Sequence, residues 1–115
     1  MKDQPRLSRA AREAIADPGN ARLLSAAAAW ELAIKASTGK LKLTLPAGRL
    51  LAEQLPLNHI ELLGTTFGDL ERLESLPFHH RDPFDRMMAA QALERGLAIV
   101  SSDPIFERYG INRIW

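Results

Sequence analysis

The sequence contains no cysteine and no long apolar run, and each absence excludes certain kinds of site or protein. Without cysteine there is no disulfide, no thiolate zinc site and no cysteine nucleophile, which fits a reducing cytoplasm. No segment is apolar over the ~20 residues needed to cross a bilayer, and no signal peptide pattern is present. We therefore expect a cytoplasmic protein without a membrane span, in which any metal is held by oxygen or imidazole.

Composition predicts one ordinary globular domain over residues 1–115, with 46% hydrophobic and 25% charged residues. The net charge of +1 indicates no particular partner. Residues 1–50, however, hold nine Lys/Arg against four Asp/Glu, and residues 51–115 hold six against ten. If the basic first half faced an acidic pocket formed by the second half, the protein could bind a polyanion. Ordinary solvent-exposed helix faces explain the same uneven charge.

Apolar periodicity, capping residues and turns predict helices that alternate with short strands. The run 41–45 fits an extended connector as well as a strand. This alternation predicts an α/β domain with a mainly parallel sheet and helices on both sides. We expect helices at 9–16, 26–37, 46–55, 66–73, 83–95 and after Asp103, and strands at 21–25, 60–63 and 97–100.

Two aspartates three residues apart open the strongest predicted helix. Pro83 suits a first helical turn, because its missing N–H would have no partner there, and Asp82 before it is a natural N-cap. Asp85 falls one turn later on nearly the same face. Asp103-Pro104 repeats this arrangement after the strand 97–100.

These acids fall where the topology of a parallel sheet brings side chains together. The ligand site of such a sheet lies beyond the C-terminal ends of its strands. Asp103 follows a strand directly, and Glu31 lies on the helix that leaves the strand 21–25. Asp82 and Asp85 open a crossover helix, whose antiparallel course puts its start at the same edge.

A carboxylate cluster without cysteine suits a hard cation such as Mg²⁺ or Mn²⁺. Such ions clamp phosphate oxygens and activate water, so a phosphodiester is the natural substrate class. Each acid also has a structural alternative. Asp82 and Asp103 suit plain helix caps, Glu31 suits an exposed pair with Lys35, and Asp85 suits the helix dipole.

Other chemistries have little support in the sequence. His79 and His80 are candidate metal ligands, but adjacent histidines in a loop more often make ordinary surface or capping hydrogen bonds. No Ser-His-Asp ordering, glycine-rich phosphate loop or nucleotide fingerprint is present, which leaves nucleophilic and nucleotide-driven reactions unsupported.

Four blocks of sequence, in order, carry a resemblance to a known family. They are PRLSRAAREAIADPGN, SAAAAWELAIKASTGKL, LPFHHRDPFDRMMAAQALERG and LAIVSSDPIFERYGI. From Pro5 to Trp115 the chain resembles a PIN-domain protein of the VapC type, the ribonuclease half of bacterial and archaeal toxin–antitoxin pairs. The resemblance implies a PIN-like three-layer α/β/α fold with a mainly parallel sheet, a homodimer, and a small VapB-like antitoxin whose tail occupies the active groove.

The resemblance also implies a site of four acidic residues that binds Mg²⁺ or Mn²⁺, and three of them can be placed here. Glu31 matches the glutamate after the tryptophan of the second block. Asp85 matches the aspartate that leads the D-x-x-x-A-A-x-A pattern, and Asp103 matches the one after the last strand. Asp82 matches an extra aspartate of this subgroup and is expected to assist as an outer ligand.

The chain departs from the family at its front. Family members usually begin with an apolar strand that ends in an aspartate and Thr-His, where this sequence has Met1-Lys2-Asp3-Gln4. The resemblance therefore implies that the central first strand and its aspartate are missing, and Asp3 lacks the strand context to replace it. Such a loss would expose two strand edges, which a strand lent by a partner or a swapped dimer would fill. The alternative is that the protein begins upstream of Met1 and includes this strand.

The resulting hypothesis is a metal-dependent endoribonuclease, the toxin of a toxin–antitoxin pair, with RNA as its substrate. Candidate phosphate contacts, by charge and position only, are Lys35, Lys40, Lys42 and Arg86. The alternative is a catalytically impaired PIN-like module that binds an antitoxin or a sister chain without cleaving RNA.

Overall fold

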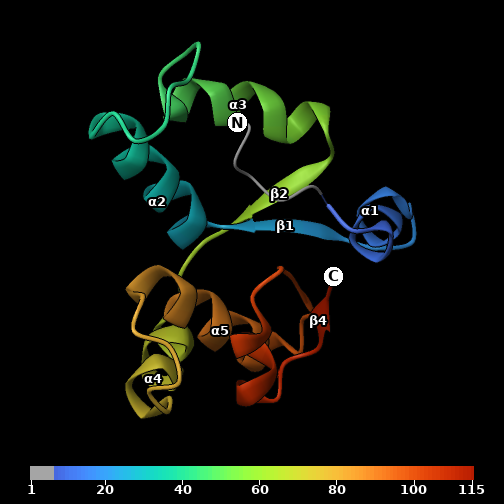
Figure 1. Cartoon of the computed structure of the whole chain (residues 1–115), viewed down its shortest axis with the longest axis vertical. Coiled ribbons are helices and arrows are strands. Elements are labelled where there is room, and N and C mark those ends of the chain that lie inside the picture. The colour runs from blue at the N-terminus through green and yellow to red at the C-terminus, as the bar shows by residue number, and fades with distance from the viewer. Residues whose placement is uncertain (1–6) are drawn as a thin grey trace.

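Helices alternate with short strands along the whole of the described chain (Figure 1). The structure is a computed structural model that describes residues 7–115, so the expectations about the first strand and Asp3 lie outside the described residues. The elements are α1 (Arg9–Ala16), β1 (Arg22–Ser25), α2 (Ala26–Ser37), α3 (Ala47–Leu57), β2 (Ile60–Leu63), α4 (Phe67–Ser75), α5 (Pro83–Arg95), β3 (Ile99–Val100), the 3₁₀ helix η1 (Pro104–Tyr109) and β4 (Arg113–Ile114).

The predicted helix starts are confirmed, and each except that of α3 has a local side-chain capping bond. Ser8 and Ser25 accept from the amides of Ala11 and Ala27, and cap α1 and α2. Asp82 caps α5 and Asp103 caps η1 in the same way. The predicted end of α5 at residue 95 is also confirmed, and Gly96, which follows it, has the left-handed φ of 64° that favours glycine. Helix α3, by contrast, runs through Pro56 to Leu57 instead of ending before that proline.

Every strand pair is parallel, which confirms the α/β class. In β1 and β2, Arg22 aligns with Ile60 and Ser25 with Leu63, while β3 pairs with β4 through Ile99 and Arg113. Within residues 7–115 the strands form two separate two-stranded sheets.

The strand predicted at 97–100 is shorter and less buried than its apolar sequence indicates. Only Ile99 and Val100 form it, and Val100 is 40% exposed. A continuous apolar run of this kind is typical of a strand buried on both faces, but here one face of β3 is exposed at Val100, and in the described chain β3 has a strand neighbour on one edge alone. That neighbour, β4, was itself missed by the sequence reasoning.

The helices lie on both sides of the β1–β2 pair. Figure 1 shows α2 and α3 on one side and α4 and α5 on the other, with η1 next to α5. Helix α5 contacts both α4 and α2, and α3 contacts β2. Helix α5 therefore joins α2, on one side of the β1–β2 pair, to α4 on the other. No helix in residues 7–115 is long and apolar enough to cross a membrane.

The main apolar core lies between α5, the end of α4 and η1. Its buried side chains are Leu76, Ala89, Ala92, Phe106 and Ile111. Trp30, an apolar residue of α2, is 64% exposed. Its ring meets Phe84 edge to face at 5.3 Å, so it fixes α2 to the start of α5 instead of filling the core.

A buried polar network holds α5 against the first sheet. Gln91 accepts from the Ser25 hydroxyl at 2.6 Å and donates to the carbonyl of Gly64 at 3.3 Å. Its amide also donates to Asp69 at 3.4 Å, and the Arg95 guanidinium pairs with the same carboxylate. The second half of α5 is thereby placed next to the ends of β1 and β2.

Candidate metal centre

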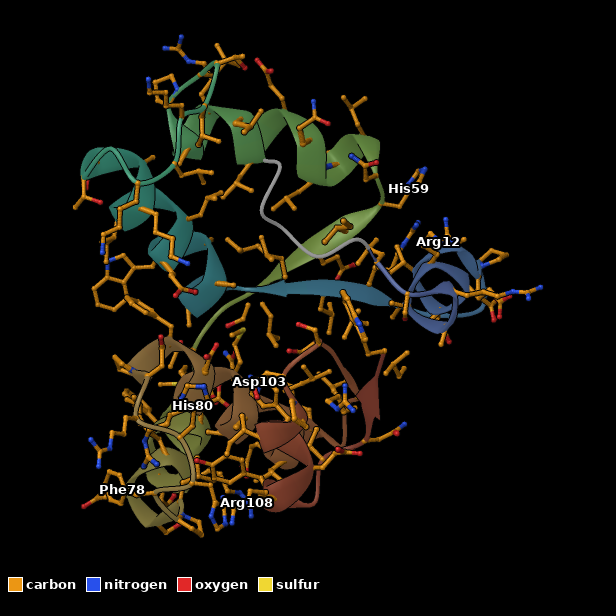
Figure 2. All side chains as sticks on the ribbon, viewed as in Figure 1. Arg12, His59, Phe78, His80, Asp103 and Arg108 are labelled. Carbon is orange, nitrogen blue, oxygen red and sulfur yellow. The ribbon has the colours of Figure 1, made fainter. Side chains whose placement is uncertain are left out.

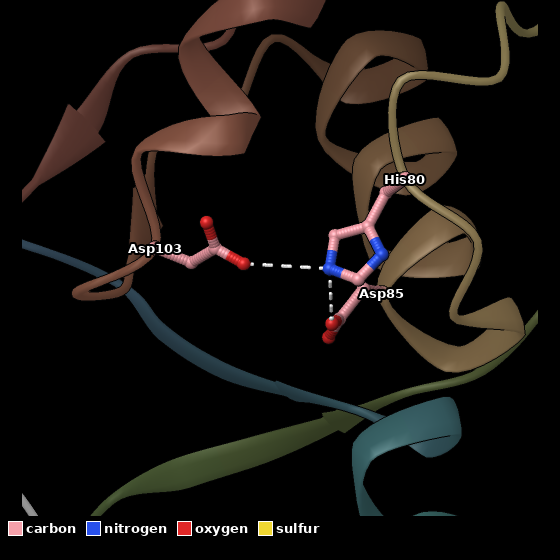
Figure 3. A group of neighbouring side chains, drawn as sticks. All are labelled: His80, Asp85 and Asp103. Atoms are coloured by element: carbon pink, nitrogen blue, oxygen red, sulfur yellow. Dashed lines mark ion pairs between the residues drawn. The ribbon is translucent and has the colours of Figure 1, made fainter.

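Three side chains from separate segments converge at the start of α5 (Figure 3). Asp85 lies in the first turn of α5, Asp103 follows β3, and His80 lies in the loop that leads into α5. One potential ligand atom from each of the three lies within 4.8 Å of the others. The His80 Nε2 is 3.0 Å from Asp85 Oδ2 and 3.3 Å from Asp103 Oδ2. The predicted convergence of Asp85 and Asp103 is thus present.

His80 is held from several directions. Its backbone N–H donates to the Tyr109 hydroxyl at 2.9 Å, and its Nδ1 accepts from the Asp82 backbone N–H at 3.0 Å. Its ring lies 6.5 Å from that of Phe106, measured between centroids. Figure 2 shows His80 and Asp103 pointing toward one another, whereas Phe78 points away from the molecule. The loop therefore presents the imidazole to the carboxylates in a fixed orientation.

The aspartates near His80 differ in whether their carboxylates cap a helix. Asp82 Oδ1 accepts from the amides of Phe84 and Asp85, so this side chain is a helix cap. Asp103 divides its two oxygens, since Oδ1 caps η1 through Ile105 and Oδ2 faces His80. Asp103 is accordingly both a helix cap and a member of the cluster. The Asp85 side chain caps no helix, since Asp82 caps α5.

Several negative charges act on Asp85. Burial is the main cause that raises the pKa of the Asp85 carboxyl above its ordinary value, and the charge of Asp82 adds to it. Glu31 and Asp103 raise this pKa further, while His80 acts against them. A carboxylate in such surroundings gains most from a cation, because the cation offsets both the burial and the repulsion.

Glu31 lies near the cluster without belonging to it. Its carboxylate is 3.6 Å from Lys35, the predicted pair one helical turn away. Its charge reaches Asp85, yet its oxygens are not among the three grouped ligand atoms. Glu31 and Asp82 thus surround Asp85 and Asp103, and their predicted roles as metal ligands stay predictions.

The candidate phosphate contacts divide into two kinds. Lys35, Lys40 and Lys42 are exposed on α2 and the connector that follows it. Arg86 is only 7% exposed and donates to the carbonyls of Leu73, Leu76 and Pro77. Its guanidinium also stacks on the ring of Phe78, 4.0 Å from the centroid. We correct the expectation for Arg86, because it joins α5 to the loop after α4 and does not face solvent.

His80 is the member of the cluster to which sequence reasoning gave too little weight. Its position two residues before the cap of α5 was visible in the sequence. What the sequence did not show is that the loop turns the ring of His80, and not that of His79, toward the acids. The ring of His79 instead lies against Tyr109, with 4.9 Å between centroids.

The donor atoms fit a divalent cation of the Mg²⁺ or Mn²⁺ kind. Two carboxylates from Asp85 and Asp103 supply hard oxygen ligands, and further negative charge from Asp82 and Glu31 surrounds them. The single nitrogen in the group belongs to His80. The described residues therefore have the chemistry of an oxygen-rich cation site.

Comparison with known proteins found one family. The family described as PIN domain matches residues 2–112, which is almost the whole chain and includes every member of the cluster. A search of curated proteins found no match.

Proposed function

The chain belongs to the PIN domain family, and on that premise we propose that it is a metal-dependent endoribonuclease of the VapC type, the toxin of a toxin–antitoxin pair. PIN domains are generally metal-dependent nucleases, and many of them are toxins. The observation that supports this function for the present chain is the convergence of Asp85 and Asp103 within the matched region. The action of such a toxin on cellular RNA would place it in the cytoplasm.

In this proposal, Asp85 and Asp103 hold Mg²⁺ or Mn²⁺, and Glu31 and Asp82 add negative charge around it. When bound, the cation supplies charge stabilisation to the phosphodiester and activates water. Asp85 is the principal ligand, because it combines burial with a side chain that caps no helix.

The exposed lysines are proposed to bind the RNA backbone. Lys35 lies on the same helix as Glu31 and one turn from it, so a phosphate beside the acids would be within reach of its ammonium group. Lys40 and Lys42 continue the positive charge along the connector after α2. Binding through these residues should weaken steeply as salt concentration rises.

The test is RNA cleavage with Mn²⁺ or Mg²⁺ by the wild type and by Asp85→Asn. We expect the variant to lose cleavage while it keeps its circular dichroism spectrum, because the substitution removes a charge without changing shape. Glu94→Gln is the matched control, since Glu94 is an exposed acid of the same helix that pairs with Arg72. Cleavage at the wild-type rate by Asp85→Asn would overturn the assigned centre.

We also propose an antitoxin partner and a homodimer, and the open strand edges support this part. In residues 7–115, β1 pairs with β2 alone and β3 with β4 alone. Leu23, Leu62 and Val100 on these strands are exposed apolar side chains. A strand supplied by a partner would pair with these edges and cover the apolar side chains. Sedimentation velocity of the purified protein tests the homodimer.

The second candidate function is the binding module that cleaves no RNA. One observation supports the binding module. In the described residues, the cluster contains two carboxylates, with one imidazole between them. Calorimetric titration with Mn²⁺ separates the two functions. A protein that gives no metal-binding heat and no cleavage, but still associates with itself or an antitoxin, is the binding module.

A further inference from the structure

Trp30 is a large aromatic side chain that the fold leaves open to solvent. It is 64% exposed, and its aromatic neighbour in the described residues is Phe84, which it meets edge to face at 5.3 Å. The two broad faces of an indole make up most of its surface, so this exposure leaves at least one face open. A single exposed apolar side chain is ordinary by itself, and its meaning depends on what surrounds it.

The surroundings of Trp30 are the acids of the candidate metal centre. Trp30 directly precedes Glu31 in α2, and Phe84 directly precedes Asp85 in α5. The contact between the two rings therefore joins the two segments that carry these acids, and α2 and α5 are packed against each other. A phosphodiester held at Asp85 would have the nucleotide next to it within reach of the open indole face.

The surface of α2 combines a charged row of side chains with an apolar one. Residues four apart share a face of a helix, so Glu31 and Lys35, whose charged groups are 3.6 Å apart, form one row. Trp30 and Ile34 form the neighbouring row, about 100° around the helix axis. Both are exposed, Ile34 to 38%. A nucleotide has the same division, because it joins a charged phosphate to a flat base with an apolar face.

We propose that Trp30 is a stacking platform for one base of a single-stranded RNA, an inference that rests on the proposed function and specifies its substrate. Lys35 contacts the phosphate of that nucleotide, and the indole of Trp30 covers its base. The strand must be single, because the bases of a duplex already stack on one another. Every base has such a face, so the contact adds affinity without selecting a sequence.

Charge and area favour RNA over a protein partner for this face. An aromatic ring among positive side chains is the usual arrangement for binding a single strand, and here Lys35, Lys40 and Lys42 supply the charge. The exposed large apolar side chains of α2 are Trp30 and Ile34. Two side chains expose far less than the ~800 Å² that each partner buries in a stable protein interface, whereas one base covers one ring.

Tryptophan fluorescence tests the contact directly, because a base that stacks on an indole quenches its emission. The sequence has two tryptophans, so the double variant Asp85→Asn/Trp115→Phe keeps Trp30 alone. Loss of Asp85, together with a chelator, prevents cleavage during the titration. We expect a single-stranded adenosine oligomer to quench the emission of Trp30. An abasic oligomer of the same length and an RNA duplex should leave that emission unchanged.

Three further substitutions, each made in Asp85→Asn, measure how much the affinity depends on the ring. Fluorescence anisotropy of a dye-labelled adenosine oligomer gives the Kd. Trp30→Leu keeps an apolar side chain against Phe84 but has no flat face, and we expect about tenfold weaker binding, within the range for stacking of one base. Trp30→Phe keeps a flat ring and should retain most of the affinity.

Phe67→Leu is the matched control. Phe67 is also an exposed aromatic residue, at 90%, but it begins α4, on the opposite side of the β1–β2 pair from α2 (Figure 1). We expect this variant to bind the oligomer as Asp85→Asn does. An equal loss of affinity in Phe67→Leu and Trp30→Leu would overturn a specific role for Trp30.

Failure of the stacking contact and failure of the proposed function give different results. If the wild type cleaves RNA with Mn²⁺ but the oligomer does not quench Trp30, or the abasic oligomer quenches it equally, the stacking role alone is overturned. Quenching without cleavage by the wild type overturns the nuclease and leaves the stacking role standing in a module that only binds. Emission that changes with protein concentration but not with RNA assigns the ring to a contact between copies and overturns the proposal. Should Trp30→Leu fail to fold, the quenching measured with Trp30 in place decides alone.

Discussion

The buried pair of Asp69 and Arg95 predicts how the stability of the protein depends on pH. Asp69 is 0% exposed, and the Arg95 guanidinium donates to both of its carboxylate oxygens. The backbone amide of Thr66 donates to it at 2.9 Å, and the Gln91 amide adds a further bond. Chiefly through Arg95, and against the effect of burial, these donors lower the pKa of Asp69 from 3.8 to about 2.

The lowered pKa gives both the direction and the size of the effect. Because the pKa of Asp69 is lower in the folded protein than in the unfolded chain, the charged carboxylate stabilises the fold fully above pH 3.8, and this contribution is lost as pH falls toward 2. At about 1.4 kcal/mol for each pKa unit, the contribution is about 2 kcal/mol. The wild type should therefore lose that much free energy of unfolding between about pH 5 and pH 2 through this residue.

Asp69→Asn removes the charge while it keeps the size of the side chain. We expect the free energy of unfolding at pH 7 to fall by about 3 kcal/mol, the low end for a broken buried pair, because Arg95 retains some contact with solvent. The acid-side decline attributed to Asp69 should also disappear. Urea unfolding followed by circular dichroism, at pH 7 and at pH 3, measures both quantities.

Glu94→Gln is the control for this prediction. Glu94 pairs with Arg72 at the surface, 3.2 Å away, and should contribute less than about 1 kcal/mol. The reasoning is refuted if Asp69→Asn unfolds as the control does at pH 7. It is also refuted if wild type and Asp69→Asn lose stability in parallel between the two pH values.

Three further substitutions follow from the structure. Asp85→Asn should raise the melting temperature of the metal-free protein at pH 7, because burial and neighbouring acids oppose the charge of Asp85. Added Mn²⁺ should not raise the melting temperature of this variant further. A melting temperature below that of the wild type, measured in chelator, would contradict the prediction. Gly96→Ala should lower the free energy of unfolding by about 1 kcal/mol in urea, since φ is 64° there, and an unchanged value would refute the strain. Trp30→Ala should cost about 1 kcal/mol by the same assay through its lost contact with Phe84, and no loss would show that this contact does not hold α2.

The features that the sequence predicts best are those that depend on residues adjacent in the chain. Asp82-Pro83 starts α5 and Gly96 ends it, because capping and a left-handed turn involve only a few adjacent residues. The approach of Asp85 and Asp103 was also predictable, since a helix that runs antiparallel to the strand after it starts at the edge where that strand ends. The pairing of these two acids therefore follows from local signals and one topological rule.

The features that sequence reasoning missed depend on contacts between distant segments. Strand β4 has two residues, too few for a periodic pattern, and exists because it aligns with β3. Trp30 has helical spacing, but spacing does not say what covers a face, and here the ring meets Phe84 and stays 64% exposed. The orientation of His80 depends on Tyr109, a residue of η1.

The polar side chains within α5 explain how a site assembled from distant segments keeps its geometry. Gln91 is buried in the second half of the helix and bonds to Ser25, which also caps α2. Since α2 carries Glu31, any shift of α5 along its axis would break this bond and change the distance from Glu31 to Asp85. An apolar residue at position 91 could be buried equally well. The Ser25 hydroxyl and the Gly64 carbonyl would then lack the hydrogen bonds that Gln91 makes to them. The register between the two acid-bearing helices is therefore fixed by a residue outside the site, which the sequence pattern presents as an ordinary polar position of a helix.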